Sequence, residues 1–170
     1  LGGIALWNGV AWTPLGGGIQ GTVNAMTVLP NGDLIAGGGL LAPGTAFERV
    51  ARWDGTSWSA LGSWLDVPYA LATLPNGKPR GDGTLVFGTA DGELLALDAA
   101  TGQERWRQSI GSEVLAAPAV GSGIVAVRTV DGRLRGFSVA NGSMLWAVEQ
   151  NLPSITLRGN TAPRVSGTLV

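Results

Sequence analysis

The sequence of 170 residues contains no cysteine and no histidine. Without cysteine the chain forms no disulfide and offers no thiolate to a substrate or to a zinc ion. Without histidine it lacks the usual base of a Ser-His or Cys-His pair. These two absences exclude most common nucleophilic and zinc-dependent reactions. They leave the redox compartment open, because a cysteine-free chain suits either environment.

A strong net charge and long apolar runs are missing as well. The net charge is −1, and arginines such as Arg52 and Arg80 occur singly, so we expect no binding of nucleic acid, which calls for a basic face. No apolar run approaches the roughly 18 to 20 residues that span a membrane, and we expect no membrane insertion. The first residues, Leu1-Gly2-Gly3, include neither an initiating Met nor the features of a signal peptide. This predicts a start that is mature, trimmed or engineered.

Glycine, in contrast, is abundant, with 28 residues spread between apolar stretches, and it accompanies internal repeats. In the first half Trp7 recurs as Trp53 and Trp12 recurs as Trp58, each 46 positions later. The shared motif is W-x-G-x-x-W, followed by L-G and then by L-P-N-G. Self-similarity at a fixed period is the signature of a repeat architecture.

The second half repeats with a different motif. Trp106 recurs as Trp146, 40 positions later, and Asp91-Gly92 recurs as Asp131-Gly132 at the same offset. The motif changes near residues 76–83, a polar stretch rich in turn-forming residues. The two halves therefore consist of two unlike repeat units.

Short apolar runs within each repeat predict strands and no helix. Runs such as 34–36, 85–87, 94–97 and 124–127 are too short for helices and are bounded by Gly or Asp-Gly. The Asn-Gly and Asp-Gly pairs predict hairpins with type I′ turns, in which both central residues have a positive φ. These pairs are Asn31-Gly32, Asp54-Gly55, Asp91-Gly92, Asp131-Gly132 and Asn141-Gly142.

Four strands in every 40 to 46 residues is the blade length of a β-propeller. The predicted fold class is therefore all-β, a β-propeller of four-stranded antiparallel blades with four blades per chain. The sixteen strands are expected as two in residues 4–16, four each in 23–62, 67–111 and 113–150, and two in 161–170. The first and last pieces are complementary halves of one blade, and pairing them removes exposed sheet edges.

Residues 83–170 resemble the quinoprotein-like (PQQ-like) repeat, through residues 97–106 and their looser copy 137–146. More narrowly, the stretch from Gly88-Thr89-Ala90-Asp91-Gly92 to Leu157-Arg158-Gly159 resembles the BamB family of eight-bladed propeller lipoproteins of the outer-membrane β-barrel assembly machinery. Residues 1–77 resemble a second family of bacterial propeller repeats, which carries the motifs W-D-G-x-x-W and L-P-N-G-D-L.

The resemblances divide the chain into blades of the W-x-G-x-x-W type at 1–77 and PQQ-like, BamB-like blades at 78–170, together one propeller or half-propeller domain. Natural propellers usually amplify one blade type, so the switch favours an engineered chimera of two half-propellers, with a natural hybrid as the alternative. The predicted function is a scaffold without catalytic activity, whose main property is folding and self-assembly. The alternative is a protein-binding scaffold module of the BamB type. The resemblance implies a periplasmic, outer-membrane-anchored parent, and the localisation of this chain stays open.

No residue is assigned to a catalytic, cofactor or metal site, and no cofactor is expected. The quinone enzymes that share the PQQ-like repeat hold their quinone over calcium with an Asp base and often a vicinal disulfide, which this chain cannot form. Asp54, Asp91 and Asp131 precede Gly in hairpins and are interpreted as turn residues. The glycine runs 16–18 and 37–39 could suggest a phosphate loop, but neither is followed by a helical pattern or by Lys-Ser/Thr.

The seven tryptophans are interpreted as packing residues. Trp106 and Trp146 fall on the last strand of a blade, and Trp53 and Trp58 flank a turn, positions from which indoles pack between neighbouring sheets. Trp64 breaks the repeat pattern, so it fills a blade interface or is partly exposed.

A set of charged side chains could form a partner surface, although a solvated surface is favoured because only about half of an eight-bladed propeller is present. The set comprises Glu104, Arg105, Arg107, Arg128, Arg133, Arg135 and Arg158.

The expected partner is a second copy of the chain, in a homodimer that closes an eight-bladed ring. Side chains between sheets set the angle between blades, and those chosen for eight blades splay too little to close a ring of four. Closed two-fold symmetry is also the commonest arrangement of homo-oligomers. The alternative is a compact four-bladed monomer that its own termini close.

Overall fold

The computed structural model describes residues 3–41, 49–62, 66–74, 83–149 and 162–164, which contain strands and no helix. The first sheet pairs β1 (Ala5–Trp7) with β2 (Trp12–Pro14). The second contains β3 (Gln20–Val28), β4 (Leu34–Leu41), β5 (Val50–Trp53) and β6 (Trp58–Ala60). The third contains β7 (Pro68–Leu74), β8 (Thr84–Thr89), β9 (Glu93–Asp98) and β10 (Glu104–Ser109). The fourth contains β11 (Ala119–Gly121), β12 (Ile124–Arg128), β13 (Leu134–Ser138) and β14 (Met144–Val148).

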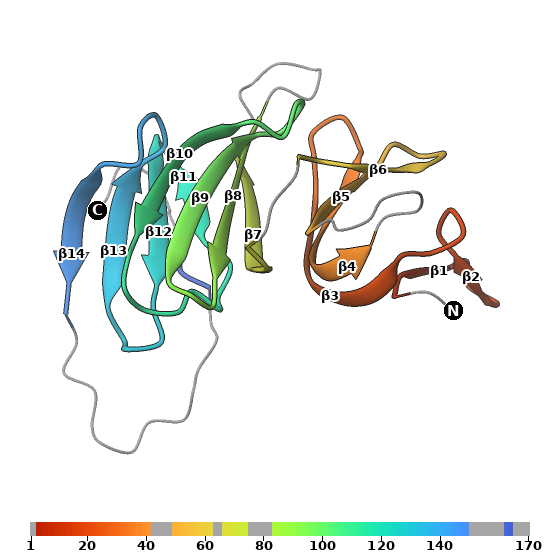
Figure 1. Cartoon of the computed structure of the whole chain (residues 1–170), viewed down its shortest axis with the longest axis horizontal. Helices are drawn as coiled ribbons and strands as arrows, with labels where there is room; N and C mark the ends of the chain where they lie inside the picture. Colours follow the sequence, from red (N-terminus) through yellow and green to blue (C-terminus); the bar gives the residue numbers. More distant parts are fainter. Residues whose placement is uncertain (1–2, 42–48, 63–65, 75–82, 150–161, 165–170) are drawn as a thin grey trace.

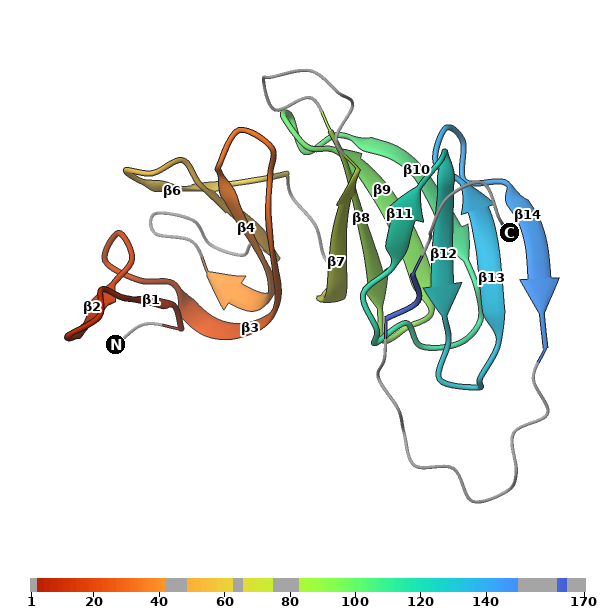
Figure 2. The same ribbon diagram turned by 180° about the vertical axis from the view of Figure 1, so that it is seen from behind.

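Each sheet is an antiparallel meander in which consecutive strands pair. The all-β prediction is confirmed, as are the strands expected in the four ranges up to residue 150. The strand pair expected at 161–170 lies outside the described residues, apart from 162–164, which form no strand. The sheets follow one another along an arc, with β1 and β2 at one end and β14 at the other (Figures 1 and 2). Among the described residues no helix is long and apolar enough to span a membrane.

The predicted hairpins form at all five Asn-Gly and Asp-Gly pairs, but the prediction of type I′ turns is wrong. Only the glycine of each pair has a positive φ, and Ser122 is the one non-glycine residue with a positive φ in the described ranges. In the β3–β4 hairpin the Gly32 amide donates to the Leu29 carbonyl at 2.9 Å, and the Leu29 amide donates to the Asp33 carbonyl at 2.8 Å. This is a three-residue loop that ends in a glycine bulge. The side chain of Asn31 instead accepts a local hydrogen bond from the Asp33 amide at 3.1 Å.

The inner strands are buried on both faces because a sheet lies on either side of them. All six residues of β8 are buried. Successive side chains of a strand point to opposite faces, so Leu85 and Phe87 pack toward the second sheet while Val86 packs toward the fourth. A strand that is apolar on both faces is therefore the mark of an internal blade.

Three buried clusters fill the three contacts between consecutive sheets, which we call the first, second and third interfaces. The first interface contains Ile4, Ile19, Ala36, Leu40, Ala51 and Trp58. The second contains Leu29, Ile35, Val50, Leu61, Leu71, Leu85, Phe87, Leu95, Leu97 and Ala99. The third contains Val86, Leu94, Ala96, Trp106, Ile110, Val114, Val125, Val127 and Phe137. The core is thus a series of layers between sheets, the packing of propeller blades.

Candidate functional site

At the first interface, tryptophans of the later sheet reach back to the earlier one. The indole Nε1 of Trp58 donates to the Leu15 carbonyl at 2.8 Å. The ring of Trp53 lies so close to Gly16 that a Cβ at this position would overlap it. Leu15-Gly16 is therefore a receiving site for two indoles of the following sheet.

At the third interface, the direction is reversed. Trp106 belongs to the earlier sheet, and its Nε1 donates to the Val139 carbonyl of the later sheet at 2.7 Å. A Cβ added at Gly142 would lie 2.6 Å from the Trp106 ring. Here the glycine of the β13–β14 loop receives an indole of the preceding sheet.

The second interface joins the two kinds of repeat, and no tryptophan belongs to its described cluster. Gly62 is the repeat equivalent of Gly16, and Gly102 is the repeat equivalent of Gly142. These two glycines lie against each other, since a Cβ at Gly102 would lie 2.7 Å from the Gly62 amide nitrogen. Two receiving sites therefore meet where the motif changes, and main chain approaches main chain directly.

The interpretation of the tryptophans as packing residues is confirmed for Trp58 and Trp106, each 7% exposed. It is wrong for Trp7 and Trp12, which are 49% and 60% exposed, because no sheet precedes the first one among the described residues. Trp64 lies outside the described residues.

A pocket lies where three loops of the third and fourth sheets meet. Its volume is about 410 Å³, and it is lined by Ala90, Asp91, Gly111, Ser112, Glu113, Val130 and Asp131. The connection from β10 to β11 forms its floor and is held on both sides, because the Val114 amide donates to the Thr89 carbonyl and the Val130 amide donates to the Glu113 carbonyl, both at 3.1 Å. The pocket therefore has a floor fixed by main-chain hydrogen bonds on both sides and is open to solvent.

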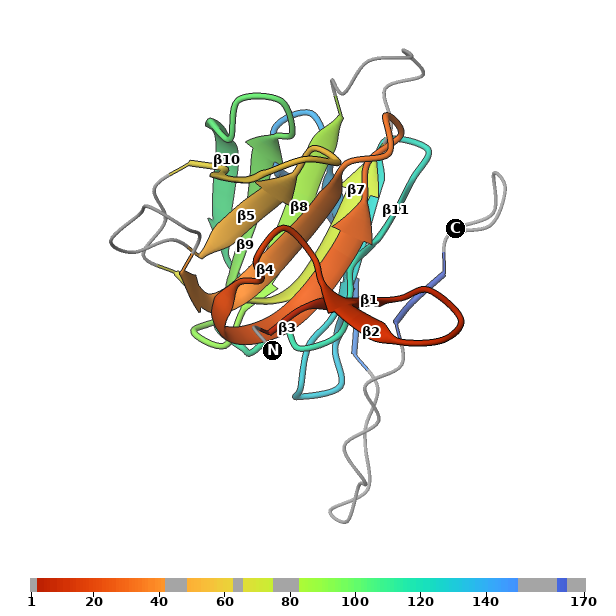
Figure 3. The ribbon, with the colours of Figure 1, turned by 90° about the vertical axis from the view of Figure 1, so that its right-hand side faces the viewer.

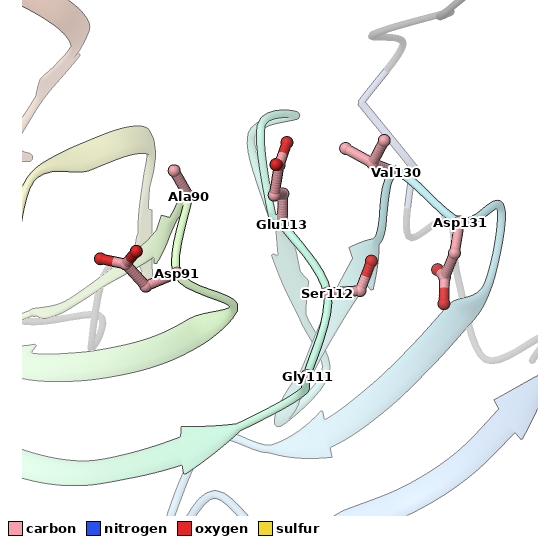
Figure 4. Close-up of a pocket in the computed structure, with 7 residues that line it drawn as sticks. All are labelled: Ala90, Asp91, Gly111, Ser112, Glu113, Val130 and Asp131. Atoms are coloured by element: carbon pink, nitrogen blue, oxygen red, sulfur yellow. The ribbon is translucent and has the colours of Figure 1, made fainter.

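The pocket is acidic, but its three carboxylates do not converge. Figure 4 shows Asp91, Glu113 and Asp131 on separate loops with their carboxylates pointing in different directions. Partial burial raises the pKa of Asp131, but the hydrogen bonds from Thr129 and Arg133 outweigh it, so that pKa lies below its ordinary value. No cluster of three acidic residues in the described ranges could hold a metal ion. The arrangement suits the binding of a polar surface better than acid–base chemistry.

Sequence reasoning identified Asp91 and Asp131 as turn residues, and their places in the β8–β9 and β12–β13 loops confirm this. Asp54 also lies in a turn, where the Ser57 and Thr56 amides hold its pKa well below its ordinary value. Sequence reasoning missed the pocket itself. The available signal was the 40-residue offset, which places Asp91 and Asp131 in equivalent loops of adjacent blades.

The charged set, for which the sequence favours a solvated surface over a partner surface, is brought together only in part. Arg105 and Arg107 share β10, where Arg105 pairs with Asp98 and Arg107 pairs with Asp66 and Glu104. The pairing with Arg105 is the main cause that lowers the pKa of Asp98 to about 2.

The remaining arginines of the set lie on the fourth sheet or outside the described residues. Arg133 pairs with Asp131 and Glu149, and Arg135 donates to the Ile110 carbonyl. Arg128 lies on β12, and Arg158 lies outside the described residues. Ion pairs within the sheets, rather than one joint patch, account for most of the set.

The two glycine runs lie in strands and turns. Residues 37–39 belong to β4, and residues 16–18 form the turn between β2 and β3. Neither run leads into a helix, whose N-terminus a phosphate loop requires.

A family model and a curated relative both relate this chain to the same family of proteins. The family model described as outer membrane protein assembly factor BamB matches residues 48–170. A protein of that name from Bordetella pertussis is 33% identical over 148 residues, which covers 87% of this chain but 35% of the relative. The chain thus spans about a third of the length of this curated relative.

Two solved structures have folds similar to that of this chain. The crystal structure of BamB from Moraxella catarrhalis superimposes with a TM-score of 0.64 at 26% identity, over 79% of this chain and 37% of that one. The computationally designed Ika4 protein gives a TM-score of 0.62 at 21% identity, over 87% of this chain and 82% of that one. The likeness to Ika4 concerns the fold alone. With sheets packed as propeller blades and a family match over most of its residues, the chain belongs to the family of the outer membrane protein assembly factor BamB.

Proposed function

We propose that this chain is a non-catalytic propeller scaffold that joins BamB-type blades to blades of a second repeat family. The observation that carries the proposal is the second interface, where Gly62 meets Gly102. A chain amplified from one blade type would place a tryptophan against one of these glycines, as happens at the first and third interfaces. Opposite directions of tryptophan packing on either side of this point are expected of a chimera, engineered or natural, with its boundary between residues 1–77 and 78–170.

The main property of the scaffold is folding and self-association. Two copies, each supplying four blades, close an eight-bladed ring around a two-fold axis. Light scattering coupled to size exclusion tests this directly. We expect about 35 kDa, twice the chain mass of 17.3 kDa. A mass of one chain refutes the dimer and supports the four-bladed monomer.

Absence of catalysis is part of the same proposal. It is supported by the lack of histidine and cysteine and by acidic residues that serve turns. Binding of a ligand to the native state raises its stability, so the melting temperature is the measurement. We expect no change with calcium, with pyrroloquinoline quinone or with both together. A rise of several degrees would contradict the proposal.

A second candidate function is a protein-binding module of the outer-membrane protein assembly type. Two observations favour it: the family match over residues 48–170 and the open acidic pocket, which lies in that part of the chain. A pull-down with the purified barrel subunit of the assembly machinery tests it, with an unrelated propeller as the negative control. Glu113→Lys should abolish capture while Glu149→Lys, the same charge change outside the pocket, should leave it intact. Equal capture by both variants would remove the pocket from the proposal, and no capture by the unaltered chain would end it.

A further inference from the structure

Exposed apolar side chains gather on the two terminal sheets. Seven of the twelve exposed large hydrophobic residues in the described ranges lie on the β1–β2 hairpin or on β14. They are Leu6, Trp7, Val10, Trp12, Met144, Leu145 and Val148. Clustered exposed apolar surface of this kind marks an interaction site more often than scattered single residues do.

The outward face of the fourth sheet repeats a face that is buried inside the chain. At the 40-residue offset, Ala126, Leu134, Gly136 and Trp146 correspond to Val86, Leu94, Ala96 and Trp106 of the third interface. Cross-strand pairing agrees, because Trp146 lies opposite Gly136 as Trp106 lies opposite Ala96. The outward face is therefore built to receive a following blade.

The indole of Trp146 has an unsatisfied hydrogen-bonding group at the outward face. Its Nε1 is buried but has no hydrogen-bond partner among the described residues, whereas the equivalent atom of Trp106 donates to the Val139 carbonyl of the next sheet. A buried N–H without an acceptor destabilises the native state, because it has lost its hydrogen bond to water. A following sheet would satisfy the Trp146 N–H if it placed a carbonyl at the position that the Val139 carbonyl occupies relative to Trp106.

The first sheet shows the complementary feature. The Trp7 and Trp12 rings lie 5.4 Å apart at 46°, and the Trp53 and Trp58 rings lie 5.5 Å apart at 48°, so the two pairs share one geometry. The Trp53–Trp58 pair is covered by Leu15-Gly16 of the preceding sheet. The Trp7–Trp12 pair is exposed and is built to meet a preceding sheet.

One terminal face thus accepts a following sheet and the other a preceding sheet. They lie at opposite ends of the arc (Figure 1), and the view along the arc shows the β1–β2 hairpin in front with the other sheets behind it (Figure 3). Within the described residues the two faces lie apart, and a second copy related by a two-fold axis would bring both pairs together at once.

We propose that the joint between two copies is a cluster of three tryptophans, Trp7 and Trp12 of one copy and Trp146 of the other. The Trp146 Nε1 donates to a main-chain carbonyl of the loop at residues 8–11, which takes the place of the β13–β14 loop at the third interface. This inference rests on the proposed self-association and names the surface that carries it.

Alanine variants test the cluster by light scattering at a series of protein concentrations. Trp12→Ala and Trp146→Ala each remove an indole from both joints of the ring, and central interface tryptophans are typical hot spots. We expect each variant to weaken the dimer roughly a hundredfold or more. Tyr69→Ala is the matched control, because Tyr69 is also exposed but lies on β7 of the third sheet, outside both terminal faces. Far-UV circular dichroism verifies that each variant keeps its β-structure.

Crosslinking provides a second test that does not depend on truncation. Since the chain has no cysteine, the only thiols are those introduced by Val10→Cys and Val148→Cys. The positions follow from the third interface, where a Cβ at Gly142 would lie 3.2 Å from the Gln108 side chain. Val148 lies 40 residues after Gln108. Val10 precedes Ala11, whose carbonyl accepts from the Asn8 amide as the Ser143 carbonyl accepts from the Ser138 amide, so Val10 holds the place of Gly142. A mixture of the two single variants should form a covalent dimer under mild oxidation, and either variant alone should not.

The possible outcomes distinguish a failure of the three-tryptophan joint from a failure of the proposed self-association. An unaltered chain that stays monomeric refutes the self-association itself. A dimer that withstands both tryptophan changes and forms no crosslink leaves self-association standing but overturns the three-tryptophan joint. An intramolecular crosslink in the double cysteine variant shows that the chain's own hairpin covers the face, which also overturns it.

Discussion

The contact between Gly142 and Trp106 gives the sharpest prediction about stability. In Gly142→Ala the new methyl would lie 2.6 Å from the indole and the residue would keep a φ of 73°. A left-handed conformation costs an L-residue about 1–2 kcal/mol, and overpacking of a filled core adds about 1–3 kcal/mol. We therefore expect Gly142→Ala to lower the free energy of unfolding by about 3 kcal/mol.

The matched control is Gly123→Ala in the same blade. Gly123 has a φ of 78°, and nothing lies within 4 Å of a Cβ placed there, so this variant bears the backbone cost alone, about 1 kcal/mol. Both are measured by urea unfolding with linear extrapolation, at one protein concentration because the proposed self-association would add to apparent stability. The difference between the variants isolates the cost of crowding the indole.

A double-mutant cycle decides whether that difference comes from Trp106. In the background of Trp106→Ala the methyl at position 142 meets no ring, so Gly142→Ala should cost no more than Gly123→Ala, which corresponds to a coupling energy of about 1–3 kcal/mol. Equal costs for the two glycine variants in the unaltered chain would refute the reasoning. So would a cost that persists without the indole.

Three further changes test other contacts. Asp98→Asn should lower stability by about 1 kcal/mol at pH 7 after allowance for solvent screening. Because the pKa of Asp98 in the folded state is lowered to about 2, this contribution is complete above about pH 4 and should vanish as pH falls toward 2. Unfolding at a series of pH values measures it. Trp58→Phe removes the donor to the Leu15 carbonyl and should cost about 1–2 kcal/mol in urea unfolding, and no loss would show that ring packing alone matters. Arg52→Met leaves the largely buried Asp33 carboxylate without its cation and should cost about 2–3 kcal/mol, a loss that Asp33→Asn in the same chain should partly restore.

The strands and hairpins could be predicted because their signals are local. A run such as 94–97 between Asp-Gly and the next turn carries its own strand signal, and the repeat offsets multiply that signal across blades. The turn type was predicted wrongly for a physical reason. Asn31, Asp54 and Asn141 keep a negative φ while their side chains accept hydrogen bonds from loop amides, and the glycine alone supplies the left-handed residue.

Features that depend on a neighbouring sheet could not be read from one repeat. Trp12 and Trp58 occupy the same motif, yet one is 60% exposed and the other 7%, because among the described residues only Trp58 has a sheet in front of it. The acidic pocket was missed for the same reason, since Glu113 joins Asp91 only when two blades pack side by side. Repeat patterns specify each blade, and the position of the blade in the chain decides what covers it.

The direction of tryptophan packing explains why the middle of the chain and its ends differ. In the first half each sheet offers a receiving glycine to the sheet that follows, as Gly16 does, and in the second half each offers one to the sheet that precedes, as Gly142 does. Placing the first kind before the second makes two receiving glycines meet at Gly62 and Gly102. The same order leaves tryptophans at both ends, facing outward on β1, β2 and β14. In the opposite order, tryptophans would face each other at the internal junction and receiving glycines would lie at the ends, so the order of the two kinds of repeat decides where the outward-facing indoles lie.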